Sequence, residues 1–306
     1  MTGIQSSLKR ELFFIALSKK RLYFSTVMCY YAIAIKNYST EDNKMKKIFA
    51  VLMVVCMVAA LGAYAFADQT FIMGIDPEYP PFSYLGDDGE YAGFDVEVCK
   101  AACEKLGWDF EVFGVNWDDK LIQLDAGECD CVWSGMTILD SMKEAGYVIS
   151  EPYFYNTQVL LVKEDSGIKS AADLAGKYVA VQLGTSGEAL LAEDLADLAA
   201  TFDQLVTCDS FLKCFTELAG GAVDAVFVDL PVAASYAAKN EGFLIINEDL
   251  GAEQYGIAFR SGDQALCDAI DGAVKELVED GTYAEIAAYY AGDIDAENLI
   301  FLSDAE

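Results

Sequence analysis

Short apolar runs alternate along this chain with longer stretches of helical periodicity. Phe71–Ile75 is apolar and β-prone, so it predicts a buried strand, and a loop with three prolines follows it. Phe94–Leu106 carries acidic residues in its first turns and is followed by Gly107, which together predict a helix. Because strands and helices continue to alternate, we expect α/β lobes with helix-covered, mostly parallel sheets.

The alternation continues almost to the end of the chain. Further strands are expected at 110–113, 129–133, 153–163, 178–181, 204–207, 223–228, 243–246 and 254–260. Further helices are expected at 118–125, 188–199, 211–219, 231–239, 265–278 and 283–290. The strand at 153–163 is long enough to cross between two bodies, and the pattern restarts after Ser166. The sequence therefore predicts two α/β lobes without a Pro/Gly-rich tether.

Residues 45–67 have the three parts of a secretory signal peptide. Met45 is followed by two lysines, 48–63 is almost wholly apolar, and Ala65 and Ala67 precede Asp68 at the spacing of a cleavage site. A transmembrane helix is the alternative, but no basic stop-transfer cluster follows the apolar run. We expect cleavage after Ala67 and export to the periplasm.

Residues 1–44 fit neither a signal peptide nor a folded domain. Basic pairs and aromatic patches are mixed there, and they push the signal away from the terminus. We expect Met45 to be the true start and the first 44 residues to be a mis-called or unstructured extension. A long, basic signal region is the alternative.

Charge changes sharply at Asp68. Nine of the 20 basic residues but only three of the 50 acidic ones precede it, so the net charge of −30 becomes −36 for the remainder. This charge makes nucleic acid and anionic membranes poor partners, and it is typical of an acidic, solvated surface. The chain has no histidine, which excludes Ser-His and Cys-His catalysis and His-ligated metal sites.

Seven cysteines follow Asp68, and none has the paired CxxC spacing of a zinc ribbon. We expect them either as small buried apolar residues or in one or two disulfides, with Cys208–Cys214 as the first candidate pair. No metal ion or cofactor is expected.

Polar loops follow several of the predicted strands, where open α/β sheets bind their ligands. Asp76 and Tyr79 lie on the proline-rich loop after the first strand, and a polar loop of this kind makes full burial of Tyr79 unexpected. The glycine-rich run 184–187 opens a helix, whose N–H groups suit an anion. Asp229 precedes Pro231 at a helix start, so the sequence alone predicts that it is an N-cap.

Ten short motifs recur in an order and at spacings that are specific only when taken together. They are Tyr79-Pro80-Pro81-Phe82, Gly93-Phe94-Asp95-Val96, Trp117-Asp118, Ser134-Gly135-Met136-Thr137-Ile138, Pro152-Tyr153, Ala175-Gly176-Lys177, Val223-Asp224-Ala225-Val226, Asp229, Tyr255-Gly256-Ile257-Ala258 and Asp280-Gly281-Thr282-Tyr283. With them, residues 70 to about 291 resemble the family 3 solute-binding proteins, the polar amino-acid-binding components of ABC importers.

The resemblance implies a two-lobe periplasmic-binding-protein-like fold (type II) that closes around a ligand. Lobe 1 would be 68–152 plus 256–306 and lobe 2 would be 158–250, with crossing hinge strands at about 153–157 and 251–255. It implies an extracytoplasmic binding protein, expected to be monomeric, that delivers a polar amino acid or related small polar ligand to an ABC transporter permease.

The resemblance also implies how a zwitterion is held. The α-carboxylate would meet the Gly135 backbone N–H, the Thr137 hydroxyl and an arginine. The α-ammonium would meet Asp229, and a loop containing Thr185 and Ser186 would close over the carboxylate.

Four further positions would contact the ligand's side chain. Tyr79 and Trp117 would sandwich it, and its tip would meet Asp76 and Gln182. A cationic or amide side chain gains cation–π contacts and charge-assisted hydrogen bonds in such surroundings. Arginine, lysine, histidine and glutamine are therefore the favoured ligands.

The chain departs from the family at the arginine. Counting forward from Gly135 puts Met142 at that position, and counting back from Tyr153 puts Lys143 there. Arg260 is the only arginine after residue 67, and it lies on a strand beyond the second crossing. Lys143 is the expected carboxylate partner. Because lysine offers a point charge and not the bidentate grip of arginine, a ligand lacking a carboxylate is the alternative.

Two other functions are compatible with the same fold. A periplasmic dehydratase acting on cyclic carboxylates needs a general acid in the cleft, for which Glu78 and Glu151 are candidates. A sensor input domain would be followed by a membrane span or signalling module, and only residues 293–306 remain for one. A non-catalytic binding protein is the preferred interpretation over both of these functions.

Overall fold

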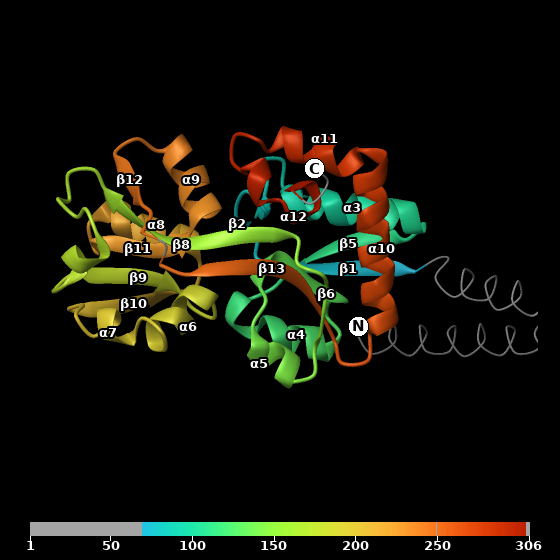
Figure 1. Ribbon diagram of the computed structural model, residues 1–306, viewed down its shortest axis with the longest axis horizontal. Coiled ribbons are helices and arrows are strands. Elements are labelled where there is room, and N and C mark those ends of the chain that lie inside the picture. The colour runs from blue at the N-terminus through green and yellow to red at the C-terminus, as the bar shows by residue number, and fades with distance from the viewer. Residues whose placement is uncertain (1–68, 249, 304–306) are drawn as a thin grey trace, which may run out of the picture. The chain divides into compact units, whose positions relative to one another are not determined.

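Parallel strands form the centre of the first half of the fold, drawn on the right in Figure 1. The computed structural model describes residues 69–248 and 250–303, so the predicted extension and signal peptide lie outside the described residues. Strand β1 (Thr70–Ile75) pairs in parallel with β5 (Asp109–Gly114) and with β6 (Cys131–Thr137). The helices that belong to this half are α3 (Phe94–Leu106), α4 (Lys120–Ala126), α5 (Asp140–Glu144), α10 (Gln264–Asp280), α11 (Thr282–Tyr289) and α12 (Ile300–Ser303), with 3-10 turns at Trp117–Asp119 and Ala296–Asn298.

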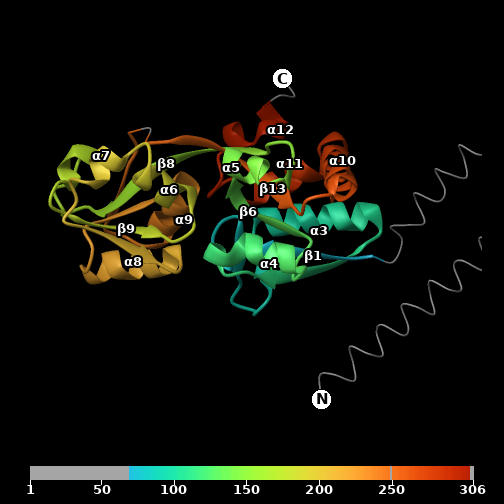
Figure 2. The ribbon, with the colours of Figure 1, turned by 90° about the horizontal axis from the view of Figure 1, so that it is seen from below.

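The second half repeats this arrangement. Parallel strands β10 (Gln204–Cys208), β9 (Tyr178–Gln182) and β11 (Ala225–Asp229) lie in that order, and β12 (Phe243–Ile246) is antiparallel to β8 (Phe154–Lys163). Its helices are α6 (Ser186–Ala192), α7 (Ala196–Ala199), α8 (Phe211–Gly220) and α9 (Leu230–Lys239), after a 3-10 turn at Ala171–Leu174. Figure 2 shows α6 and α7 on the opposite side of β9 from α8.

Side-chain burial explains why the strands read as continuous apolar runs. In β11, Val226 and Val228 belong to the cluster that contains the α8 side chains, whereas Ala225 and Phe227 belong to the one that contains Leu191 of α6. Strands covered on both faces need apolar residues at every position. The α/β class and the parallel core of each half are thus as predicted.

Two long strands are shared by the sheets of both halves. Strands β8 (Phe154–Lys163) and β13 (Ala252–Phe259) run between the halves in Figure 1 and pair with each other in antiparallel fashion from Phe154–Tyr255 to Thr157–Ala252. Strand β8 continues against β11, and β13 continues against β6 and β7 (Val148–Ile149). The pairing is therefore continuous from one sheet to the other, at the residues where the hinges were predicted.

A small antiparallel sheet follows β1 and holds the proline-rich loop. Its strands are β2 (Glu78–Tyr79), β3 (Ser83–Leu85) and β4 (Tyr91–Ala92). None of the described helices is long and apolar enough to span a membrane.

The predicted cysteine pairing is wrong in this structure. Cys208 ends β10 and Cys214 lies in α8, and their thiols interact through a hydrogen bond without a covalent link. All seven cysteines of the described chain are free and buried. This agrees with the alternative interpretation, in which they are small apolar residues of the core.

Asp95 is a buried acid at the start of α3. It is fully buried, and its Oδ2 accepts hydrogen bonds from the Tyr153 hydroxyl (2.7 Å) and from the Gly135 N–H (2.8 Å). Burial raises the pKa of this carboxyl to about 7. Asp95 therefore links α3, β6 and the residue that precedes β8.

Replacing Asp95 by asparagine is expected to remove a pH dependence of stability. Between the unfolded pKa and about 7 only the folded protein keeps the proton, so the stability of the wild type relative to Asp95→Asn falls as pH rises, by about 3 kcal/mol between pH 5 and pH 8. Urea unfolding of both proteins at these two pH values measures the difference. An equal difference at both values would contradict the assignment.

Candidate functional site

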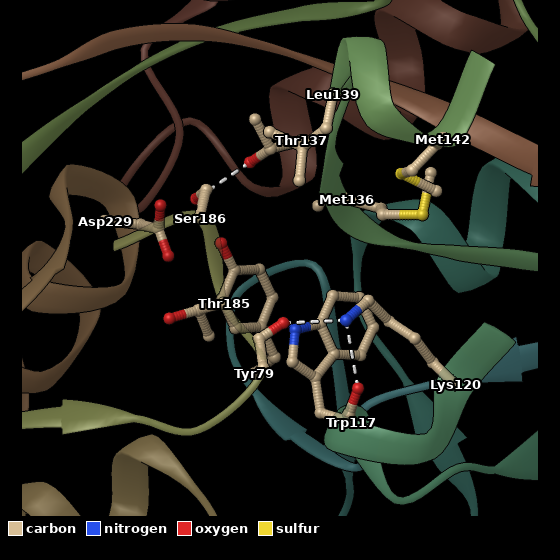
Figure 3. A pocket seen from close by; sticks show the side chains of 12 residues that line it. Tyr79, Trp117, Lys120, Met136, Thr137, Leu139, Met142, Thr185, Ser186 and Asp229 are labelled. Atoms are coloured by element: carbon tan, nitrogen blue, oxygen red, sulfur yellow. Dashed lines mark hydrogen bonds between the residues drawn. The ribbon is translucent and has the colours of Figure 1, made fainter. Parts of the chain in front are cut away.

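A small pocket lies where loops of the two halves meet at the ends of their strands. It encloses about 40 Å³, which is room for a few water molecules. The first half contributes side chains from the proline-rich loop, from the start of α4 and from the end of β6, and the second half contributes Thr185, Ser186 and Asp229 (Figure 3). Of the ten residues predicted for the site, Tyr79, Trp117, Gly135, Thr137, Thr185, Ser186 and Asp229 line this pocket.

Lys120 supplies positive charge to the pocket and was missed by the sequence analysis. Its Nζ lies 4.7 Å from the centre of the Trp117 ring and donates to the carbonyls of Trp117 (3.0 Å) and Gly184 (2.7 Å). Burial lowers the pKa of Lys120 to about 8, against the opposing effect of carboxylates led by Asp118. The signal available in the sequence was its position three residues after Trp117.

The loop that opens α6 touches the first half closely. Gly184 has a φ of 73°, and a Cβ added there would lie 2.7 Å from Asp118 Cα. Thr185 is the N-cap of α6, where its Oγ1 donates to the Gln182 carbonyl (2.7 Å) and accepts from the Glu188 N–H (3.2 Å). Ser186 accepts a 3.1 Å hydrogen bond from the Thr137 hydroxyl, which also joins the two halves.

Tyr79 and Gly135 line the pocket in a way that differs from expectation. Tyr79 is only 5% exposed, because its ring packs against Phe82 and Phe211 and its hydroxyl bonds that of Tyr255 at 2.9 Å. Gly135 has a φ of 52°, and a side chain there would overlap the Tyr79 ring. The Gly135 N–H is already donated to Asp95, so it does not point a free donor at a ligand.

Asp229 lies at the N-cap position of α9 without capping it. Its side chain makes no hydrogen bond to the helix; its Oδ1 accepts from Asn156 Nδ2 (2.6 Å) and Gln158 Nε2 (2.7 Å), both on β8. The side chain is 4% exposed and lines the pocket. The interpretation of Asp229 as an N-cap is therefore not supported, because the capping hydrogen bond is absent.

Asp76 and Gln182 contact each other and do not line the pocket. Gln182 Nε2 donates to Asp76 Oδ2 at 2.7 Å, and both side chains are buried. Burial raises the pKa of Asp76, and the hydrogen bonds from Gln182 and Glu78 oppose this shift only in part. Gln182 Oε1 is buried without a partner among the described residues, and the place of these two groups at the tip of the ligand's side chain stays a prediction.

Lys143 also lies away from the pocket. Its ammonium pairs with Asp140 at 3.6 Å within α5, and its side chain is 54% exposed. Met142, the other position that the count left open, lines the pocket. The two acids considered for a dehydratase, Glu78 and Glu151, are not among its lining residues.

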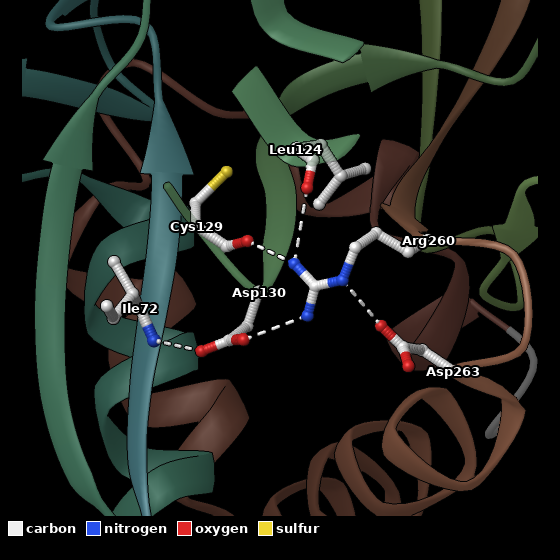
Figure 4. A network of polar contacts seen from close by, with 6 residues as sticks. All are labelled: Ile72, Leu124, Cys129, Asp130, Arg260 and Asp263. Carbon is white, nitrogen blue, oxygen red and sulfur yellow. Dashed lines mark hydrogen bonds and ion pairs between the residues drawn. The ribbon is translucent and has the colours of Figure 1, made fainter. Parts of the chain in front are cut away.

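Arg260 is held in a structural network in the first half (Figure 4). Its guanidinium donates to the Leu124 and Cys129 carbonyls and pairs with Asp130 (3.0 Å) and Asp263 (2.9 Å). All of its nitrogens are thereby occupied, so this arginine stays out of the pocket, as its position in the sequence indicated.

Known proteins of similar sequence and structure are binding proteins. The family model "Bacterial extracellular solute-binding proteins, family 3" matches residues 71–293. The L-cystine-binding protein TcyJ of Escherichia coli is 32% identical over 254 residues, covering 79% of this chain and 93% of that protein.

Two solved structures show the same two-lobe type II fold. A substrate-binding protein of an ABC uptake transporter from Streptococcus pneumoniae, with bound histidine, has a TM-score of 0.71 at 27% identity, covering 74% of this chain and 94% of the other. An ancestral arginine-binding protein bound to arginine has a TM-score of 0.67 at 36% identity, with coverages of 72% and 98%. The family match extends over most of the described chain, and the chain therefore belongs to the family 3 bacterial extracellular solute-binding proteins.

Proposed function

We propose that this protein binds a polar, preferably cationic, L-amino acid and presents it to the permease of an ABC importer. The observation that carries the proposal is that Lys120 and Asp229, of opposite charge, line one pocket from different halves. A zwitterion joins them, with its carboxylate on Lys120 and its ammonium on Asp229. Relatives named for cystine, arginine and histidine support an amino acid as the ligand.

Lys120 takes the place of the family arginine in this proposal. Its ammonium lies over the Trp117 ring and faces the pocket beside the 184–186 loop (Figure 3). The ammonium has three N–H donors, of which Trp117 and Gly184 take two, so a bound carboxylate can accept the third and keep the lysine charged. A cationic ligand side chain gains from the surplus of carboxylates, since Asp76, Asp118 and Glu188 all act on Lys120.

Closure of the two halves accompanies binding, because ligand contacts on both sides select the closed form. Export through the signal peptide at 45–67, a monomeric state and delivery to a permease belong to the same proposal. Two hydrogen bonds join the halves, one between Lys120 and Gly184 and one between Thr137 and Ser186. They support a closed form in which the halves meet as they do here.

Two experiments on the protein without residues 1–67 test the proposal. The first is mass spectrometry of small molecules released from the purified protein, and the second is a thermal-shift screen of the twenty amino acids. A polar amino acid is expected in the first experiment, and the same one should raise the unfolding temperature most in the second. Recovery of a chemically altered product from a cyclic carboxylate, or no shift with any amino acid, would contradict it.

Replacing Gly184 by alanine is expected to weaken amino-acid binding about 10-fold or more. The added Cβ meets Asp118 only when the halves are closed, and the positive φ adds strain. Isothermal calorimetry measures the affinity, and small-angle scattering measures closure. Gly167→Ala, also at a positive φ but with open space around its Cβ, is the matched control and should bind like the wild type.

A further inference from the structure

A second carboxylate lies beside Asp229 on the other crossing strand. Glu253 lies on β13, directly opposite Asn156 of β8 in the ladder that joins the two halves. Its Oε1 accepts from Asn156 Nδ2 at 2.6 Å and from Gln158 Nε2 at 3.0 Å. The same two nitrogens donate to Asp229 Oδ1, so two amides are shared between two carboxylates.

This arrangement has more acceptors than donors. Asn156 and Gln158 are 7% and 1% exposed, and the remaining oxygen of each amide is buried without a partner among the described residues. Two carboxylates and two free amide oxygens thus surround donors that are already used. In the free protein Glu253 and Asp229 also hydrogen-bond each other, and a proton on this pair supplies one further donor. A ligand group with several N–H donors and a positive charge, such as an ammonium or guanidinium group, supplies more donors and balances both charges.

The site borders the pocket, although Glu253 itself is not among the lining residues. Asp229 and Ser186 line the pocket, and Ser186 is also a hydrogen-bond partner of Glu253. We propose that Glu253 is a second carboxylate for the ligand's cationic group, so that the hinge strand itself takes part in recognition. This inference rests on the proposed function and specifies how the ammonium group of the amino-acid ligand is held.

The charge state of the pair supplies a signature of this contact. Burial, then the negative charge of Asp229, raises the pKa of Glu253 to about 8, so the free protein holds a proton here at neutral pH. The other titratable groups that act on this pair are the hydroxyls of Tyr79 and Tyr255, whose pKa values are themselves raised by burial. A cation bound between the carboxylates lowers the pKa of Glu253 and releases its proton.

Calorimetry at pH 6.5 in buffers of different ionisation enthalpy measures that proton. At this pH Lys120, with a pKa of about 8, is already charged and takes up almost none. The probes are L-arginine, L-histidine, L-glutamine and L-cystine. With those that bind, the wild type is expected to release close to one proton per ligand, on the order of 0.9.

Glu253→Gln keeps an acceptor for both amides but holds no titrating proton. It is expected to release less than about a fifth of a proton and to bind about 10-fold more weakly. The matched control Glu164→Gln, an exposed acid next to the end of β8, should behave like the wild type. Glu253→Asp, which retains a carboxylate, should retain proton release.

Two results separate failure of this inference from failure of the proposed function. A wild type that binds an amino acid without releasing a proton, or a Glu253→Gln variant that releases as much as the wild type, overturns the role of Glu253 alone. A wild type that binds none of the four probes overturns the proposed function, and the inference with it.

Discussion

Replacing Lys120 by methionine is expected to weaken amino-acid binding by about 100-fold or more, which is about 2.7 kcal/mol. Methionine keeps an apolar side chain of similar length but removes the cation–π contact with Trp117 and the charge that pairs with the carboxylate. The loss should disappear for a ligand without a carboxylate. Calorimetry with L-arginine and with its decarboxylated amine, agmatine, measures both effects.

Two lysine variants make this result specific. Lys120→Arg keeps a cation at the same place and should recover part of the affinity. Lys143→Ala removes an exposed lysine paired with Asp140 and should leave the affinity unchanged. If Lys143→Ala abolishes binding while Lys120→Met does not, Lys143 regains the role that the sequence assigned to it.

Replacing Asp229 by asparagine is expected to have a comparable effect at the other end of the ligand. The asparagine Oδ1 can still accept from Asn156 and Gln158, but the NH₂ that replaces the second carboxylate oxygen cannot balance an ammonium. We expect a loss of about 100-fold for every amino acid that binds the wild type. The loss should be much smaller for deaminated analogues.

Asp224→Asn is the matched control, because Asp224 immediately precedes the other end of β11, away from the pocket. It accepts from the Tyr178 N–H and pairs with Lys177, so its loss affects stability more than binding. Equal losses of affinity in the two variants would show that Asp229 acts through the strand and not through the ligand.

Local signals predicted the secondary structure well where the elements carry their own start and stop residues. Helix α3 ends at Leu106 as predicted, because Gly107 adopts the left-handed conformation that ends helices. The predicted helix at 188–199 instead breaks into α6 and α7 at Glu193, whose ψ of −92° is not helical. No glycine or proline marks this break, so nothing in the local pattern could reveal it.

Long-range contacts limited the prediction of the site. Motif spacing brought seven of the predicted residues to one pocket, because each lies at a strand end whose position the fold determines. The contact between Asp76 and Gln182 depends on how the halves approach, which no local pattern encodes. Glu253 was also missed, although it lies two residues before Tyr255 and therefore shares its face of β13.

The ladder between β8 and β13 has a mechanical consequence. Because Asn156 and Glu253 are backbone partners within it, the residues proposed to sense the ligand's charge lie on the segment that is predicted to bend when the halves separate. Neutralising that charge changes the repulsion inside the bending element itself. Ligand chemistry and hinge stiffness would then depend on the same two positions, Asn156 and Glu253, and a substitution at either should alter the resting angle together with the affinity.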